Sequence, residues 1–184
     1  MNPQLLLRIG DEDDIAAIVE LLNTCYRGRE GWTTEADIIA GERVSAEAVE
    51  AMLADRRRYF FVFDNLPGEA DTPGSLLGCI VVWLDPAAPE RTACVEMAAV
   101  HPAIQQQGIG GEMLRQVEDF ARRHLRQGWM KMEIVAGREA LLAYYRRRGY
   151  QATGSERVLR DEENYGCPKN GSIRMIELAK RLDG

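Results

Sequence analysis

The residues best suited to binding an anion lie in a glycine-rich turn near the middle of this 184-residue chain. Residues 105–111 read Gln-Gln-Gln-Gly-Ile-Gly-Gly and join a β-rich run to an amphipathic helical pattern. The first amides of a helix have no partner within it and lie at the positive end of its dipole, so a phosphate can approach a start that lacks bulky side chains. We therefore expect this turn to hold a phosphate or pyrophosphate group. A glycine-rich turn without any ligand is the alternative.

Two familiar nucleotide-binding loops do not match this turn. The dinucleotide fingerprint needs a third glycine where Met113 stands. A nucleotide P-loop needs Gly-Lys-Ser or Gly-Lys-Thr, which the sequence does not contain. The ligand should thus belong to another class of phosphate-bearing molecule.

A second segment that could take part in catalysis is the helical pattern over residues 139–148. It carries Tyr144 and Tyr145 and is followed by Gly149 and Tyr150. A phenol has an ordinary pKa of about 10, so it stays protonated at neutral pH and can act as a general acid. Aromatic residues on helices often pack in the core, which is the alternative for both tyrosines.

The strand expected over residues 94–100 brings a carboxylate close to the turn. Glu96 stands two residues before Ala98, so strand alternation puts both on one face unless a bulge intervenes. A carboxylate there suits the removal of a proton from an ammonium group, whose ordinary pKa is about 10.4. An ordinary solvated glutamate is the alternative.

Together these segments resemble the two signatures of the GNAT acyltransferases. Gln105-x-x-Gly108-x-Gly110, preceded by His101-Pro102, is similar to the motif that holds the pyrophosphate of acyl-CoA. Tyr145, four residues before Gly149 and its aromatic neighbour, is similar to the second signature. The resemblance extends over most of the chain and implies an N-acetyltransferase that uses acetyl-CoA as co-substrate, without a metal.

The resemblance also implies a role for each segment. Tyr145 would donate a proton to the leaving thiolate of CoA, and Glu96 is our candidate for the general base, with a chain of waters as the alternative. The backbone of Ala98 would polarise the thioester carbonyl and, with that of Val100, bind the pantetheine arm. The expected cofactor-binding residues are Ala98, Val100, Gln105, Gln106, Gln107, Gly108, Ile109, Gly110 and Gly111.

The chain departs from the family pattern at two positions. An asparagine commonly stands seven residues before the tyrosine and an alanine four before it, whereas this chain has Arg138 and Leu141. We interpret Arg138 as an exposed arginine at a helix start, outside the site. The triple-arginine runs 56–58 and 146–148 are interpreted as solvated helix faces.

The acceptor is expected to enter along residues 27–41, which are too polar for a core strand. Tyr26-Arg27-Gly28 and the run from Gly31 to Glu35 resemble a segment of a bacterial GNAT subgroup. Glu35 would pair with an amine, and Trp32 would contact an apolar or cationic part of it, or else simply pin the loop. The candidate substrate residues are Tyr26, Trp32 and Glu35.

Composition limits the partners. The 23 Lys and Arg against 29 Asp and Glu give a net charge of −6, which disfavours nucleic acid as a ligand. The two histidines, His101 and His124, and four cysteines without a C-x-x-C pair offer no recognisable metal site. No stretch of transmembrane length or leader pattern is present, so we expect no membrane partner and a cytoplasmic location. A homodimer is possible by resemblance.

The elements that must position these residues form one domain over residues 1–184. Helical periodicity covers residues 15–26, 45–55, 108–126 and 139–148, and β-rich runs cover 5–9, 59–63, 76–84, 94–100, 130–135, 150–158 and 172–178. Hairpin strands come first and a βαβ crossover lies in the middle. We expect a GNAT-like α/β (α+β) fold, with a mixed, mainly antiparallel sheet of six to seven strands and about four helices on its two faces.

Three functions are consistent with the sequence. The first is an enzyme that moves an acetyl group from acetyl-CoA to a primary amine of a small molecule by direct attack in a ternary complex. The second is a non-catalytic regulator that binds acyl-CoA on the same fold. The third is a modifier of protein N-termini or lysines.

Overall fold

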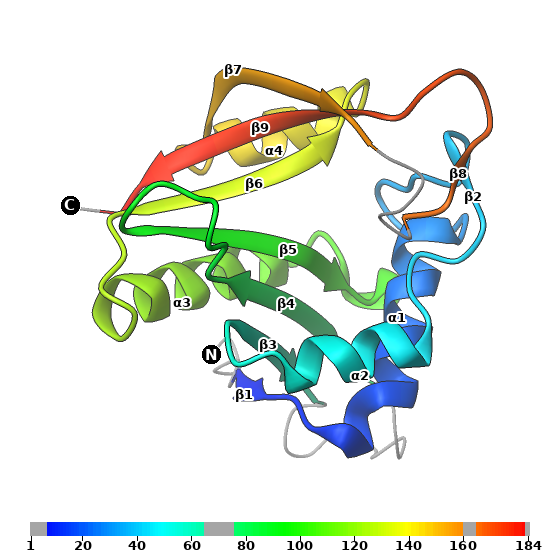
Figure 1. The fold of residues 1–184 in the computed structure, drawn as a ribbon. Coiled ribbons are helices and arrows are strands. Elements are labelled where there is room, and N and C mark those ends of the chain that lie inside the picture. Colours follow the sequence, from blue (N-terminus) through cyan, green and yellow to red (C-terminus); the bar gives the residue numbers. More distant parts are fainter. Residues whose placement is uncertain (1–6, 65–75, 160–164, 183–184) are drawn as a thin grey trace.

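The computed structural model describes residues 7–64, 76–159 and 165–182. A seven-stranded sheet in the order β1-β3-β4-β5-β6-β9-β7 forms its centre (Figure 1). The strands are β1 (Arg8–Ile9), β3 (Arg58–Phe63), β4 (Gly78–Trp83), β5 (Thr92–Val100), β6 (Trp129–Val135), β7 (Gln151–Val158) and β9 (Arg174–Arg181). The α-helices are α1 (Ile15–Arg27), α2 (Ala46–Ala54), α3 (Ile109–Arg123) and α4 (Glu139–Arg146).

All pairings in this sheet are antiparallel except that of β5 with β6. The parallel pair is the consequence of the crossover through α3, which links the end of β5 to the start of β6. The expected mixed sheet, mainly antiparallel with four helices, is confirmed. None of the helices in the described parts of the chain is long and apolar enough to cross a bilayer.

Each face of the sheet has its own core. On one face α1 and α2 pack through residues such as Ile18, Leu22 and Val49. On the other face α3 and α4 pack through Met113, Val117 and other apolar side chains. The helices therefore sandwich the sheet, and each presents the apolar stripe that its sequence periodicity predicts.

Local capping explains where the first two helices begin. Asp11 caps the turn η1 (Glu12–Asp14), which leads into α1, and Asp14 completes a capping box with it. Ser45 accepts a hydrogen bond from the Ala48 amide at the start of α2. These polar residues satisfy amides that have no helical partner, so the helices start where the sequence predicts.

β5 and β6 separate toward their carboxyl ends (Figure 1). Their pairing covers only residues 92–95 of β5 and 129–132 of β6. In the same part of β5 a bulge interrupts the pairing with β4, because Met97 and Ala98 together face the single residue Ile80. Met97 has a φ of 52°, which lies in the left-handed region. The last residues of β5 thus have a sheet partner on one side only.

Some features differ from the expectations. A two-stranded sheet of β2 (Ile39–Ala40) and β8 (Cys167–Pro168) joins the segment after α1 to the segment before β9, which no local pattern indicated. The expected first strand at 5–9 is described only from residue 7, and the loop at 64–75 lies almost wholly outside the described residues.

We predict that Leu178→Ala lowers the free energy of unfolding by about 2 to 5 kcal/mol, because Leu178 in β9 is 0% exposed and the truncation leaves a cavity. Val158→Ala is the matched control, since that side chain is 54% exposed on β7, and should cost less than about 1 kcal/mol. Urea unfolding followed by circular dichroism measures both. Equal losses would contradict the described core.

Candidate active site

The glycine-rich turn forms a helix start with unpaired amides. After the turn η2 (Pro102–Ile104), Gly108 adopts a φ of 83° and caps α3. The amides of Gly111 and Glu112 both bond to the Gly108 carbonyl at 3.1 Å. The amides of Ile109 and Gly110 have no acceptor within the described residues. This start of α3 therefore presents free N–H groups at the positive end of the helix dipole.

Two glycines let α4 approach this helix start. A Cβ on Gly110 would lie 2.9 Å from the Tyr144 hydroxyl, and one on Gly111 would lie 2.9 Å from Nη2 of Arg148. The Arg148 guanidinium also lies over the Tyr144 ring, 3.5 Å from its centroid. Arg148 is therefore half-buried beside the turn, contrary to the expectation that this arginine run only solvates a helix face.

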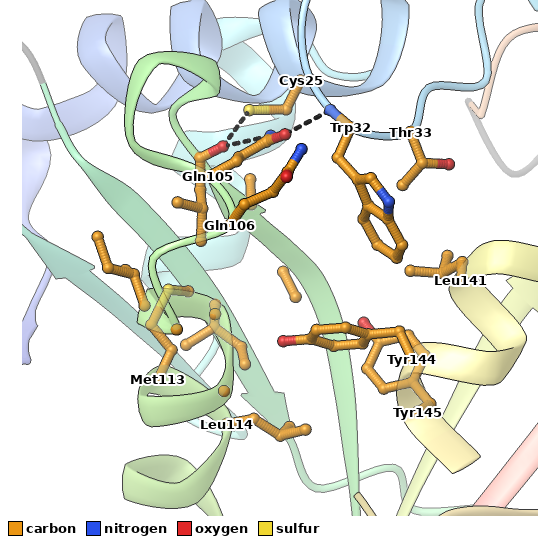
Figure 2. A pocket seen from close by; sticks show the side chains of 18 of the residues that line it. Cys25, Trp32, Thr33, Gln105, Gln106, Met113, Leu114, Leu141, Tyr144 and Tyr145 are labelled. Carbon is orange, nitrogen blue, oxygen red and sulfur yellow. Dashed lines mark hydrogen bonds between the residues drawn. The ribbon is translucent and has the colours of Figure 1, made fainter. Parts of the chain in front are cut away.

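Gln105 connects the turn to the loop after α1. Its Nε2 donates to the Val100 carbonyl at 2.9 Å, and its Oε1 accepts from the Trp32 amide at 2.5 Å (Figure 2). The Trp32 indole in turn lies 5.6 Å from the Tyr144 ring, centroid to centroid. The Gln105 side chain is thus occupied by protein contacts, and it fixes the position of the Trp32 loop.

A pocket of about 510 Å³, which we call the turn pocket, opens in front of this helix start. Its wall includes Gln106, Gly110, Trp32, Tyr144 and Tyr145, and Figure 2 shows these aromatic side chains on the side of the pocket opposite α3. Ala98 and Val100 line it from β5.

A second pocket of about 740 Å³, which we call the sheet pocket, lies beside the first. It is lined by charged side chains of the sheet together with residues of α2 and of the loop after α1, among them Glu96, Arg43 and Glu35. Tyr26, Ala98, Arg138, Leu141 and Tyr145 line both pockets. The two pockets therefore share a wall where β5 and β6 have separated.

Tyr145 occupies this shared wall. Its ring packs edge-on against Tyr144 and Tyr150, at centroid distances of 5.2 and 5.8 Å. Burial raises the pKa of the Tyr145 phenol to about 12, so the group remains protonated over the physiological range. The Tyr145 hydroxyl donates to no acceptor within residues 7–64, 76–159 and 165–182.

Glu96 lies in the sheet pocket on β5. Its Oε1 is 3.5 Å from Nε of Arg58 but makes no hydrogen bond to any described residue. Burial raises the pKa of the Glu96 carboxyl above the ordinary value of 4.5, and nearby Arg58 and Arg43 only partly oppose the shift. The bulge at Met97 breaks the alternation that would have put Glu96 and Ala98 on one face, although both line the sheet pocket.

Glu35 is buried at the end of the sheet pocket and is only 1% exposed. Its Oε2 accepts from Arg27 at 2.6 Å, and its Oε1 accepts from Arg138 at 2.9 Å and from the Tyr165 hydroxyl at 3.0 Å. Both oxygens therefore already have cationic partners. The carboxylate organises the pocket instead of standing free for an amine.

The strand, the turn and the helices described above all lie within the part of the sequence that matches a known protein family. The model of the acetyltransferase (GNAT) family matches residues 15–150, from α1 through the tyrosine-bearing α4 to Tyr150. The chain belongs to the acetyltransferase (GNAT) family. Membership assigns this GNAT protein to the class of acetyl-CoA-dependent N-acetyltransferases, as the resemblance of its two motifs had implied.

One curated relative is N-alpha-acetyltransferase RimI of Mycobacterium tuberculosis, which is 40% identical over 88 residues. The match spans 48% of this GNAT protein and 53% of RimI, about half the length of each.

Solved structures share the fold at low identity. The ribosomal-protein-S18-alanine N-acetyltransferase from Escherichia coli has a TM-score of 0.67 at 17% identity, covering 98% of this chain and 96% of its own. An N-acetyltransferase from Staphylococcus aureus Mu50 has a TM-score of 0.68 at 16% identity, covering 98% and 99%. A candidate acetyltransferase from Salmonella typhimurium, solved with its cofactor acetyl-CoA, has a TM-score of 0.67 at 19% identity, covering 98% and 95%.

The structure brings most of the residues singled out from the sequence to one place. Of the expected cofactor residues, all except the exposed Gln107 line the turn pocket. The three expected substrate residues divide between the pockets: Trp32 lines the turn pocket, Glu35 lines the sheet pocket, and Tyr26 lines both.

The sequence interpretation missed several residues of the sheet pocket. The side chain of Arg138 is only 9% exposed and lines both pockets, so its interpretation as an exposed helix-start arginine was wrong. The departure from the family asparagine at this position was the available signal. Arg43 and Tyr165 gave no such signal, because chain segments far apart in sequence bring them together.

We predict that Gln105→Leu releases the loop that carries Trp32, because this variant loses the bonds to Val100 and Trp32 while keeping similar volume. Amide hydrogen exchange at Trp32 should accelerate about tenfold or more, as expected for the loss of about 1.4 kcal/mol of local stability. Gln107→Leu, at an exposed position of the same turn, is the control. Unchanged exchange in Gln105→Leu would show that this side chain does not hold the loop.

Proposed function

We propose that this GNAT protein transfers the acetyl group of acetyl-CoA to a primary amine of a small molecule, by direct attack in a ternary complex. The observation that carries the proposal is the placement of Tyr145 in the wall shared by both pockets. A group at that position touches a thioester held on one side and an amine held on the other. A regulator without catalytic activity would have no use for a protonated phenol there.

The turn pocket is proposed to bind acetyl-CoA. Free amides at the start of α3 would hold the pyrophosphate, and the unpaired edge of β5 would hold the pantetheine arm. The His101 amide bonds to Leu77 on the β4 side. Because successive amides of a strand point in opposite directions, the Val100 amide points toward the separated edge. The Ala98 amide, next to the bulge, is proposed to face the same edge.

The chemistry then needs three groups. Glu96, or a water chain that ends on it, takes a proton from the substrate ammonium, and its raised pKa brings it closer to that task. The neutral amine attacks the thioester carbonyl, whose oxygen gains negative charge and is stabilised by the Ala98 amide. The carbon–sulfur bond breaks as the thiolate takes the Tyr145 proton, so the products are the N-acetylated amine and free CoA.

Acetylation of a protein N-terminus is the second candidate, and it is favoured by the partial match to RimI. The two candidates use the same cofactor site and the same phenol. They differ in what the sheet pocket must accept, which is either a whole small molecule or the first residues of a chain.

We predict that Tyr145→Phe lowers kcat by about 100-fold or more, because loss of a general acid typically costs that much. The Kd for acetyl-CoA, measured by calorimetry, should stay within about twofold because the phenyl ring still packs against Tyr144 and Tyr150. In the wild type this donor should not limit kcat up to about pH 10, given a pKa of about 12. An unchanged kcat in the variant would remove Tyr145 from the mechanism, and absence of acetyl-CoA binding by the wild type would contradict the function itself.

Glu96→Gln tests the base. The carboxylate acts as a base only when it is ionised, and burial raises its pKa above 4.5. The kcat/KM of the wild type should therefore fall as the pH drops through this raised pKa. The variant should be slower and should lack this acidic limb. Asp55→Asn is a control, since Asp55 shares the neighbour Arg58 at 3.8 Å but lines neither pocket. A Glu96→Gln enzyme with the wild-type pH profile would identify another proton acceptor.

A further inference from the structure

Arg43 is a buried arginine that pairs with no acidic side chain in the described part of the chain. It is 7% exposed, and its guanidinium stacks on the rings of Tyr165 and Tyr26, 4.0 and 5.3 Å from their centroids. Across the described ranges its guanidinium forms no ion pair or hydrogen bond, and its Nε is buried without an acceptor. Burying a charge in this way is unfavourable, and stacking on aromatic rings offsets it only in part.

Arg138 is a second buried guanidinium with spare donor capacity in the same pocket. Its Nη1 bonds to Glu35 and its Nη2 to the Thr33 hydroxyl at 3.1 Å, but its Nε is buried with no acceptor in the described residues. Arg138 and Arg43 both line the sheet pocket, and Tyr145 belongs to the same wall. Unused donors on two arginines thus lie close to the proposed reaction centre.

Among the described residues, the charges around Glu35 do not balance. Glu35 is shared between Arg27 and Arg138, so one carboxylate serves two guanidinium groups, and Arg43 adds a third cation. Each nitrogen of the Arg27 guanidinium already has an acceptor, because Arg27 also donates to the carbonyls of Gly41 and Tyr165. The remaining positive charge belongs to Arg43 and Arg138, both of which line the sheet pocket.

We propose that Arg43 and Arg138 form a subsite for a compact anion, and that the acceptor is a primary amine that carries such an anion, as a free amino acid does. This inference rests on the proposed function. The fork of a guanidinium matches a carboxylate or a phosphate, and a bound anion would accept from the Nη groups of Arg43, which donate to no described residue. Glu96 lies in the same pocket, so a zwitterionic acceptor meets a carboxylate at its ammonium end and guanidinium groups at its anionic end.

The alternatives fit these contacts less well. The phosphates of CoA belong to the turn pocket, whereas Arg43 lines only the sheet pocket. A polypeptide N-terminus has an uncharged peptide group where an amino acid has its carboxylate, so it would leave Arg43 without a partner. The stacking of Arg43 on Tyr165 and Tyr26 holds the guanidinium in place but satisfies none of its donors.

The test on the wild-type protein uses matched acceptors with saturating acetyl-CoA. The twenty common amino acids are compared with their carboxamides, O-phosphoethanolamine with ethanolamine, and two short peptides with free N-termini and amidated C-termini are added. Release of CoA thiol is followed for each. At least one anionic acceptor should exceed its neutral partner in kcat/KM by about 10- to 100-fold, the range expected for a charge-assisted hydrogen-bonded pair. The amino-acid and phosphoamine arms identify which anion is bound.

Variants locate the subsite. Arg43→Met and Arg138→Met should each reduce the ratio of kcat/KM between the anionic acceptor and its neutral partner about tenfold or more, mainly through a higher KM for the anionic acceptor. Arg43→Lys should retain part of the preference because it keeps the charge without the fork. Arg174→Met is the control, since Arg174 is exposed, pairs with Glu156 and lines neither pocket.

The outcomes separate the two levels of the proposal. Turnover with equal rates for anionic and neutral partners, or with a preference for the peptides, overturns the anion subsite and leaves the acetyltransferase reaction standing. A preference that persists in both methionine variants also overturns it. Thiol release with none of the acceptors contradicts the proposed function itself. The comparison of acceptors on the wild type needs no variant to fold.

Discussion

The separation of β5 from β6 is the constraint on which the site depends. Four residues of each strand pair in parallel, and beyond them β5 has no neighbouring strand on that side. An unpaired strand inside a sheet is unfavourable unless another group completes its hydrogen bonds. The bulge at Met97 lies in this same part of β5. It reverses the faces on which the following side chains lie, at the point where β5 no longer pairs with β6. A ligand that lies along this edge replaces the missing strand.

Helices α3 and α4, which share one face of the sheet, both lie beside the gap between β5 and β6. α3 begins just after β5, and its first two amides have no acceptor among the described residues. α4 and the turn after it place Tyr144 and Arg148 against that start, because Gly110 and Gly111 have no side chains. Tyr145, one residue on, then reaches the wall that both pockets share. The proposed anion site and the proposed proton donor therefore depend on one close contact between helices.

The parts of this arrangement that are local in sequence could be predicted, and the parts made by distant contacts could not. The turn before α3 and the tyrosines of α4 carry spacing that indicates their roles, and periodicity predicted the helices and most strands. Arg138 was misjudged because its burial depends on Glu35, more than a hundred residues away. Arg43 gave no signal at all, because its environment is made by Tyr26 and Tyr165. Alternation along β5 failed at Met97, because a bulge is set by pairing geometry and not by residue type.

The loop after α1 joins two functions that the sequence suggested were separate. Trp32 is bonded to Gln105 of the glycine-rich turn, and three residues later Glu35 holds Arg138 of the sheet pocket. A ligand that shifts the turn therefore moves the support of the other pocket, and by thermodynamic linkage a ligand in the sheet pocket acts back on the turn with the same coupling free energy. The short loop thus supports both pockets, so a change of structure at one pocket is transmitted to the other through Trp32 and Glu35.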